Sequence, residues 1–323
     1  MSRNLILVLG SSNTDMIIKM DRLPKAGETL LGGEFLSAAG GKGANQAVAA
    51  ARAGGTVKFI ARVGRDIFGE KAVAGFIADG INVDHVVRDD TSPSGVALIF
   101  VAKDGENSIA VASGANARLL PADVLHAGSA FRDAAVLLLQ LETPLETVQA
   151  AAELAAGAGV RVILNPAPAQ SLPDALLKNV FLITPNESEA ESLTGIAVNT
   201  EAAANQAADK LLARGVQNVI ITMGSRGAFV ATKELRRLVP AFKVEAVDCT
   251  GAGDIFNGAL AAALAEGKSL FEAALFANAA AAVSVLRLGA QTSAPTHDEI
   301  KQRLNGHAST LLADVAGQSL VNA

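Results

Sequence analysis

Residues 135–165 read AVLLLQLETPLETVQAAAELAAGAGVRVILN, and the alternation within this stretch sets the fold class. Two short apolar runs, at 135–142 and 160–165, end in polar residues, which is typical of buried strands. The Ala-rich segment 145–156 between them consists largely of good helix formers. Strand, helix and strand in this order predict parallel strands joined by a helix.

The same rhythm continues through most of the chain. Further strand-like runs occupy 5–10, 57–64, 180–186 and 219–224, and helix-like runs occupy 44–53, 66–79 and 202–213. We therefore predict an α/β fold with a mostly parallel central sheet and helices on both faces. Residues 1–305 are assigned to this single domain, and the tail at 306–323 carries no strong pattern.

Two segments interrupt the rhythm, at about 14–36 and 94–112. Both read as strands and hairpins without helices between them, and we interpret them as a small β-sheet lid inserted into the main domain. The run VALIFVA at 96–102 is apolar throughout, so both faces of that strand need cover. Lid-to-lid contact in a homodimer would supply that cover, and packing on the chain's own main domain is an equal alternative.

The composition argues against several classes of function. Half of the 323 residues are hydrophobic and 18% are charged, which suits a large packed core. The net charge is −5 and no basic run exceeds Arg236–Arg237, which argues against binding of nucleic acid or a membrane surface. No apolar run approaches the roughly 18 residues of a membrane span, and 5–9 is too short for a signal peptide. We expect a cytoplasmic protein.

Polar residues follow five of the predicted strands. In a parallel sheet these strand ends meet at one edge, where ligands bind, so their convergence predicts a site. The polar endings are Gly10–Asn13, Gln140–Glu142, Asn165, Thr184–Asn186 and Thr222–Gly224.

The segment DCTGAGDIFNGAL at 248–260 compresses two glycines and an acid into a turn before an apolar helix. The first turn of a helix offers N–H groups without intrahelical partners, and Gly251 and Gly253 allow close approach of a ligand, so the turn can bind phosphate. Asp254 beside it can take a proton from an alcohol that receives a phosphoryl group. An ordinary N-terminal capping aspartate is the alternative. The spacings of a P-loop and of a dinucleotide-binding fingerprint are both absent.

A second glycine-rich turn, AAGGKGANQAVAAARAG at 38–54, precedes an Ala-rich helix. Lys42 and Asn45 would offer donors to a neutral polyol, while the glycines admit it against the backbone. Taken alone, this segment is equally described as a glycine-rich turn that leads into a helix and has no binding role.

Together these motifs resemble the PfkB carbohydrate kinase family, over residues 4–305. Nine motifs occur in the family's order: GSSNTD (10–15), GGKGANQA (40–47), VALIFV (96–101), QLETPLE (140–146), NPAPA (165–169), TPNESEAE (184–191), TMGSRG (222–227), DCTGAGDIFNGAL (248–260) and GAQTSAP (289–295). The resemblance implies ATP-dependent phosphorylation of D-ribose at O5. Two alternatives stay open: another furanose or ketose sugar such as 2-deoxyribose, and a non-catalytic sugar sensor.

The resemblance also implies roles for individual residues. Asp254 would be the general base, and the N–H groups of Gly251, Ala252, Gly253 and Asp254 the anion hole. The sugar would be held by Asn13, Asp15, Gly41, Lys42, Asn45, Glu142 and Asp254. ATP would be held by Asn186, Glu189, Thr222, Gly224, Ser225, Gly227, Gly253 and Asn278.

Two metal ions are implied in the same way. Asn186 and Glu189 would act indirectly on Mg²⁺, with a helix-capping pair as the alternative. An activating K⁺ would lie among Asp248, Thr250, Ser284, Arg287, Gly289 and Ser293. Cys249 departs from the family's usual threonine, and we interpret it as a partly buried packing residue and not as a nucleophile.

Overall fold

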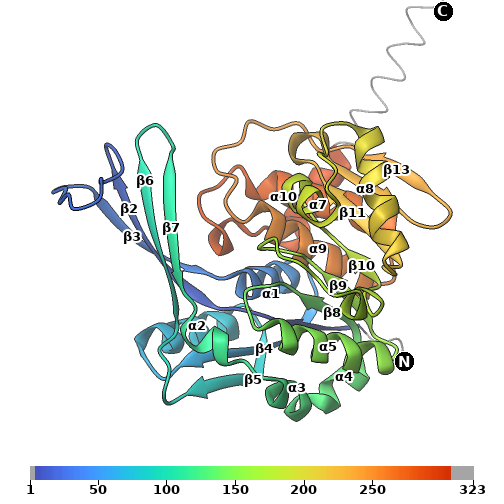
Figure 1. Ribbon diagram of the computed structural model, residues 1–323, viewed down its shortest axis with the longest axis horizontal. Coiled ribbons are helices and arrows are strands. Elements are labelled where there is room, and N and C mark those ends of the chain that lie inside the picture. The colour runs from blue at the N-terminus through green and yellow to red at the C-terminus, as the bar shows by residue number, and fades with distance from the viewer. Residues whose placement is uncertain (1–3, 307–323) are drawn as a thin grey trace, which may run out of the picture.

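The computed structural model describes residues 4–306 and contains two β-sheets of different size (Figure 1). The larger has nine strands in the order β13-β12-β11-β10-β9-β8-β1-β4-β5. Only the pairings of β12 with β11 and with β13 are antiparallel in it. The strands are β1 (Leu5–Leu9), β4 (Thr56–Gly64), β5 (Asn82–Asp89), β8 (Ala134–Leu139), β9 (Arg161–Leu164), β10 (Leu182–Ile183), β11 (Asn218–Thr222), β12 (Ala228–Ala231) and β13 (Arg236–Val239).

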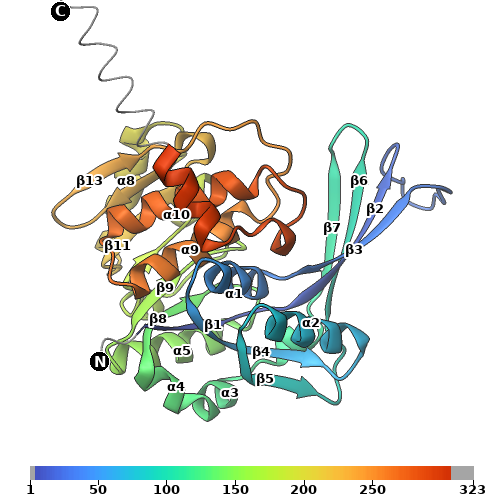
Figure 2. The same cartoon turned by 180° about the vertical axis from the view of Figure 1, so that it is seen from behind.

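Helices cover both faces of this sheet, which confirms the predicted fold class (Figures 1 and 2). On one face lie α1 (Lys42–Arg52), α2 (Ile67–Ala78), α9 (Ala252–Ala265) and α10 (Leu270–Ser284). On the other lie α3 (Pro121–His126), α4 (Gly128–Asp133), α5 (Leu145–Gly157), α6 (Asp174–Leu177), α7 (Glu187–Thr194) and α8 (Glu201–Ala213). Short 3₁₀ turns lie at η1 (Gly114–Arg118), η2 (Gly224–Arg226) and η3 (Gln291–Ser293), and residues 297–306 are helical.

Strand β1 shows why its sequence is apolar throughout. Ile6 and Val8 contact the core on the side of α1 and α9, whereas Leu5, Leu7 and Leu9 contact the core on the opposite side. Alternate side chains of a strand point to opposite faces, so a strand covered on both faces needs apolar residues at every position.

Close packing of α1 against α9 depends on Gly258. A Cβ atom at this position would lie 2.5 Å from the Cβ of Ala49 and 2.6 Å from the carbonyl oxygen of Gln46. A larger residue would therefore push the two helices apart. This contact matters because Asn45 and Gln46 of α1 bind the carboxylate of Asp254 on α9 in the site described below.

The smaller sheet is made of β3 (Glu34–Gly40), β2 (Asn13–Met20), β6 (Gly95–Ala102) and β7 (Asn107–Ala112), in that order. It projects from the main body beside the carboxyl ends of the central strands (Figure 2). We refer to it as the lid. Strands β2, β6 and β7 coincide with the two segments that interrupt the strand–helix rhythm, whereas most of β3 lies beyond residue 36. Strand β1 leads into β2 through only three residues.

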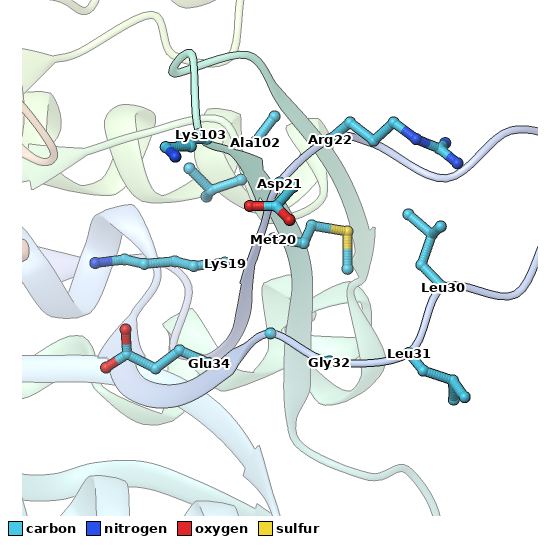
Figure 3. A pocket seen from close by; sticks show the side chains of 12 residues that line it. Lys19, Met20, Asp21, Arg22, Leu30, Leu31, Gly32, Glu34, Ala102 and Lys103 are labelled. Atoms are coloured by element: carbon cyan, nitrogen blue, oxygen red, sulfur yellow. The ribbon is translucent and has the colours of Figure 1, made fainter.

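The lid contains a cavity of about 620 Å³ at the end of β2 and β6 (Figure 3). Lys19, Leu31, Glu34 and Lys103 are among its lining residues. None of the predicted site residues lines it within the described chain.

Among residues 4–306, no helix is both long and apolar enough to cross a membrane. Of the predicted tail at 306–323, residue 306 is helical and 307–323 lie outside the described residues.

Candidate active site

Asp254 lies in the first turn of α9, and its carboxylate is buried between that helix and α1. Nδ2 of Asn45 donates to Oδ2 of Asp254 over 2.9 Å, and Nε2 of Gln46 donates to Oδ1 over 2.9 Å. Burial raises the pKa of Asp254, while the Lys42 charge and the two amide donors act in the opposite direction. The site thus holds a buried carboxylate whose two oxygens are both oriented by α1.

The turn that precedes α9 leaves the start of this helix open. Gly251 has φ of 73°, a left-handed conformation that favours glycine, and no side chain caps the helix among the described residues. The N–H of Ala252 donates back to the carbonyl of Cys249 over 3.2 Å. The anion-binding capacity of the turn therefore rests on the amides of Gly253 and Asp254, with less from Ala252 than the sequence predicts.

Two cavities meet at this turn. The smaller, of about 200 Å³, is lined by Lys42, Asn165, Ala167, Thr184, Asn186, Glu189, Thr222, Cys249, Gly251, Ala252, Gly253, Asp254 and Asn257. The larger, of about 670 Å³, shares Asn186, Thr222, Cys249, Ala252 and Gly253 with it. The helix N-terminus therefore stands between two ligand-sized spaces, where both ligands could reach its N–H groups.

The predicted sugar-binding residues come together beside Asp254. Oε2 of Glu142 accepts the Lys42 amide over 2.9 Å and the Ser11 hydroxyl over 2.5 Å. The pKa of Asp15 is raised to about 6, first by burial and then by the charges of Glu142 and Asp254. Because those two carboxylates act on Asp15, three acidic groups from β2, the loop after β8 and α9 converge at one place.

The remaining members of this set lie at the base of the lid. A Cβ atom at Gly41, the residue before α1, would lie 2.7 Å from the amide nitrogen of Asn13. Oδ1 of Asn13 accepts Nδ2 of Asn116 over 2.7 Å. Asn116 also exchanges hydrogen bonds with the backbone of Ser12, so it holds the junction between β1 and β2.

The predicted nucleotide-binding residues line the larger cavity, except Glu189, which lines the smaller. Apolar walls come from Phe242, Val244, Ala281 and Val285. Nδ2 of Asn278 is not directed at a ligand, because it donates to the carbonyls of Val239 and Pro240 over 3.0 and 3.1 Å. The cavity thus offers a largely apolar slot with polar groups at one end.

Asn186 and Glu189 form the helix-capping pair that the sequence left as an alternative. Asn186 accepts the Glu189 amide over 2.8 Å, and Glu189 accepts the Asn186 amide over 2.8 Å. Burial raises the pKa of Glu189, and the positive charge of Lys42 lowers it. Both side chains still line the smaller cavity, so their oxygens fit a magnesium ion held through water.

The predicted potassium-binding residues lie in two loops that pack beside Gly251. Asp248 accepts the amides of Thr250 and Gly289 over 2.9 and 2.8 Å, and its own amide donates to the carbonyl of Val285. Although burial acts against it, these donors lower the pKa of Asp248. The hydroxyl groups of Ser284 and Ser293 donate to backbone carbonyls.

The positively charged guanidinium of Arg287 has no acceptor atom and pairs with Glu299, so Arg287 can contact a cation only through its backbone carbonyl. Hard oxygen atoms are what an alkali ion needs, and here the loops supply them from Asp248 and from backbone carbonyls. Among residues 4–306, no three His, Cys, Asp or Glu side chains gather in a metal-binding cluster.

The interpretation of Cys249 as a partly buried packing residue is wrong. Its side chain is exposed and lines both cavities, because the 246–251 loop stands at the surface between them.

Sequence reasoning missed Gln46 and Asn257, although each has a detectable signal. Asn257 is a lone amide inside the apolar run DIFNGAL, and Gln46 follows Asn45 at the start of the apolar run QAVAAA. A polar group buried in such a helix needs a partner. Nδ2 of Asn257 donates to the Gly253 carbonyl over 2.8 Å, and its Oδ1 accepts the Thr184 hydroxyl over 2.6 Å. It therefore braces the turn from within α9.

An α/β fold with a lid, a buried carboxylate and an open helix start between two cavities defines a group-transfer enzyme of the kinase type. Residues 3–297 match the family model described as pfkB family carbohydrate kinase, so the chain belongs to this family.

Several relatives are similar over nearly their whole length. A ribokinase of Haemophilus influenzae is 47% identical, covering 92% of this chain and 97% of that protein. A deoxyribokinase of Salmonella typhi is 40% identical, with 93% of this chain and 98% of that protein covered. A solved structure of Arabidopsis thaliana ribokinase complexed with ribose and ATP is 34% identical with a TM-score of 0.87, covering 94% of this chain and 99% of that one.

Proposed function

We propose that the protein transfers the γ-phosphoryl group of ATP to O5 of D-ribose and releases ADP and ribose 5-phosphate. The observation that carries this proposal is the position of Asp254 and the start of α9 where the two cavities meet. A nucleotide in the larger cavity and a sugar among the polar groups beside Asp254 would present their reacting groups to the same turn. The similarity to ribokinases supports ribose as the acceptor.

In the transfer step, O5 attacks the γ-phosphorus and the bond to the bridging oxygen of ADP breaks. Asp254 accepts the proton of the O5 hydroxyl, and the amides of Gly253 and Asp254 stabilise negative charge on the phosphoryl group. The Lys42 charge, which acts on both Asp254 and Glu189, adds positive potential on the sugar side. A bound Mg²⁺ near Asn186 and Glu189 would supply further neutralisation of phosphate charge.

The sugar is held by the buried polar groups around the base. Oδ1 of Asn45 is buried and has no hydrogen-bond partner among the described residues, so a sugar hydroxyl can donate to it. Asp15 and Glu142 supply charged acceptors, which bind alcohol hydroxyls more strongly than neutral acceptors do. Asn13, Gly41 and Lys42 complete the proposed set at the base of the lid.

We further infer that K⁺ activates the enzyme from the loops around Asp248. The loop at 289–293 packs against Gly251, where a Cβ atom would lie 2.7 Å from the Cβ of Ala290. An ion there would order the turn that presents the N–H groups. Replacing K⁺ by a large organic cation at constant ionic strength should lower kcat, and an unchanged rate contradicts this part of the proposal.

2-Deoxyribose is a second candidate acceptor, because the Salmonella typhi deoxyribokinase is 40% identical to this chain. The chemistry and the base would be the same, and the choice would depend on contacts to the 2-hydroxyl near Asp15. Comparing kcat/KM for ribose and 2-deoxyribose decides between them. A preference for 2-deoxyribose would leave the mechanism intact and change the substrate.

We infer that two copies associate through their lids. Exposed apolar side chains lie on both faces of the lid: Phe35 and Leu98 on one, Leu36, Ile109 and Val111 on the other. A patch of this kind on a thin sheet is typical of an interface. Light scattering should give a dimer that Leu98→Asp or Ile109→Asp weakens, whereas a wild-type monomer at micromolar concentration contradicts it. A cytoplasmic location fits an enzyme that consumes ATP.

A further inference from the structure

A chain of buried amides contacts Asp254, and one member of it, Asn165, also lines the smaller cavity. Gln46 and Gln140 are both fully buried. Nε2 of Gln140 donates to Oε1 of Gln46 over 2.6 Å, and Nε2 of Gln46 donates to Oδ1 of Asp254 over 2.9 Å and to Oδ1 of Asn165 over 3.0 Å. Gln46 on α1 therefore links one oxygen of the carboxylate to Gln140 at the end of β8 and to Asn165 at the end of β9.

The direction of these bonds is fixed at Asp254 and Asn165, which both present acceptor oxygens to Gln46, and Gln140 donates to the remaining oxygen of Gln46. An amide has a donor nitrogen and an acceptor oxygen, and the oxygen of Gln46 is already engaged by the Gln140 nitrogen. Gln46 must then present its nitrogen to Asp254. With the amide reversed, its oxygen would face the carboxylate and its nitrogen would face the Gln140 nitrogen, so both contacts would be repulsive.

Gln46 does not reach the ligand space. It lines neither of the two cavities that border Asp254, and its oxygen is already engaged by Gln140. Asn45 also lines neither cavity, but its Oδ1 is buried without a partner among the described residues and remains available for a sugar. The two neighbouring amides thus hold opposite oxygens of one carboxylate, and only Asn45 has an acceptor left over. Gln46 borders the ligand space only through its contacts with Asp254 and Asn165, and the double variant below separates these two routes.

We infer that Gln46 is a positioning residue for the catalytic base and that Gln140, by donating to the oxygen of Gln46, supports its orientation. This inference rests on the proposed role of Asp254. Gln46 holds the plane of the carboxylate so that the second oxygen faces the hydroxyl that loses its proton, and it favours the charged form of a carboxylate that burial disfavours. The close α1–α9 contact at Gly258 brings the amide within hydrogen-bond distance.

The test replaces Gln46 by methionine, which keeps the length and removes the hydrogen bonds. Loss of a buried hydrogen bond to a charged group predicts a fall in kcat of about 10- to 100-fold. The KM values for ribose and ATP should stay within about threefold, because Gln46 touches neither ligand. Gln140→Met should give a smaller fall, and Gln149→Met, whose amide donates to Glu153 on the surface, should give none.

Two further readouts separate positioning from a merely structural role. The charged groups that face Asp254 are Lys42, Glu142 and Asp15, and they are unchanged in the variant. Loss of the Gln46 donor should therefore raise the pKa of Asp254, and the acidic limb of the kcat–pH profile should move to higher pH. In an Asp254→Asn background, Gln46→Met should cause no further loss of kcat. Calorimetric binding of ATP to each variant verifies that it is folded.

The outcomes are distinct. An equal loss from Gln46→Met in both backgrounds, a change confined to the ribose KM, or unchanged kcat in Gln46→Met overturns the positioning role. If Asp254→Asn itself keeps wild-type kcat, the proposed base is wrong, and that result is read independently of Gln46.

Discussion

Glu142 accepts the backbone N–H of Lys42 over 2.9 Å, so a carboxylate 100 residues away in sequence caps the first turn of α1. The same oxygen accepts the Ser11 hydroxyl. This relationship connects the glycine-rich turn before α1 to the segments that follow β1 and β8. Glu142 is also one of the residues proposed to bind the sugar. Substitutions at this position can separate its sugar-binding role from its role in capping α1.

Glu142→Gln keeps an oxygen for the Lys42 amide and removes the charge. We expect the KM for ribose to rise about tenfold or more, since a charged acceptor is lost, with little change in Tm. Glu142→Ala should show the same rise and also a lower Tm, because the Lys42 amide then lacks its acceptor. Glu146→Gln, on the exposed first turn of α5, is the control. Steady-state kinetics and scanning calorimetry measure both effects, and equal Tm values for the Gln and Ala variants would refute the capping role.

Asp15→Asn should stabilise the ligand-free protein at high pH. The pKa of Asp15 is raised from 3.8 to about 6 on folding, so the folded state binds more protons than the unfolded chain between these values. Stability is therefore lost as pH rises through this window, and the whole cost is present above about pH 6. The gain in Tm of the variant over wild type should be larger at pH 8 than at pH 4.5. An identical difference at both pH values would contradict the raised pKa.

Gly251→Ala tests the turn that starts α9. The left-handed backbone and the contact with Ala290 should together cost about 1–3 kcal/mol of stability and displace the N–H groups, lowering kcat. Adding Ala290→Gly should recover part of the Tm, because it removes the contact but not the backbone strain. Gly157→Ala, where an added Cβ meets nothing within 4 Å, is the control. A Gly251→Ala enzyme with wild-type Tm and kcat would show that the turn tolerates a side chain.

Local patterns predicted much of the fold. Apolar strands buried on both faces and Ala-rich helices are encoded within short segments, so β1, β8 and α5 appear within a few residues of their expected bounds. The antiparallel edge formed by β12 and β13 was not predicted. Arg236–Val239 is short and half polar, and only its pairing with β12 makes it a strand.

The candidate site was predicted only in part, because its geometry depends on how distant segments pack together. Polar residues at strand ends do converge, as the Asn165 and Thr184 contacts in the smaller cavity show. Whether an amide on α1 faces ligand or core depends on how α1 packs against α9, which the sequence of α1 alone does not contain. Gln46 and Asn45 are adjacent in sequence, yet they hold different oxygens of Asp254 and only one has an acceptor left over.

The most direct test of the central claim is ADP release with Mg-ATP and K⁺, measured with ribose, 2-deoxyribose and fructose, for wild type and Asp254→Asn. The account predicts turnover that favours ribose and a kcat about 10²- to 10⁴-fold lower in Asp254→Asn, with binding of both substrates retained. Turnover of ribose at the wild-type rate by Asp254→Asn would contradict the role of the base. Sugar binding without ADP release in the wild-type protein would contradict the enzyme itself and indicate a sugar sensor.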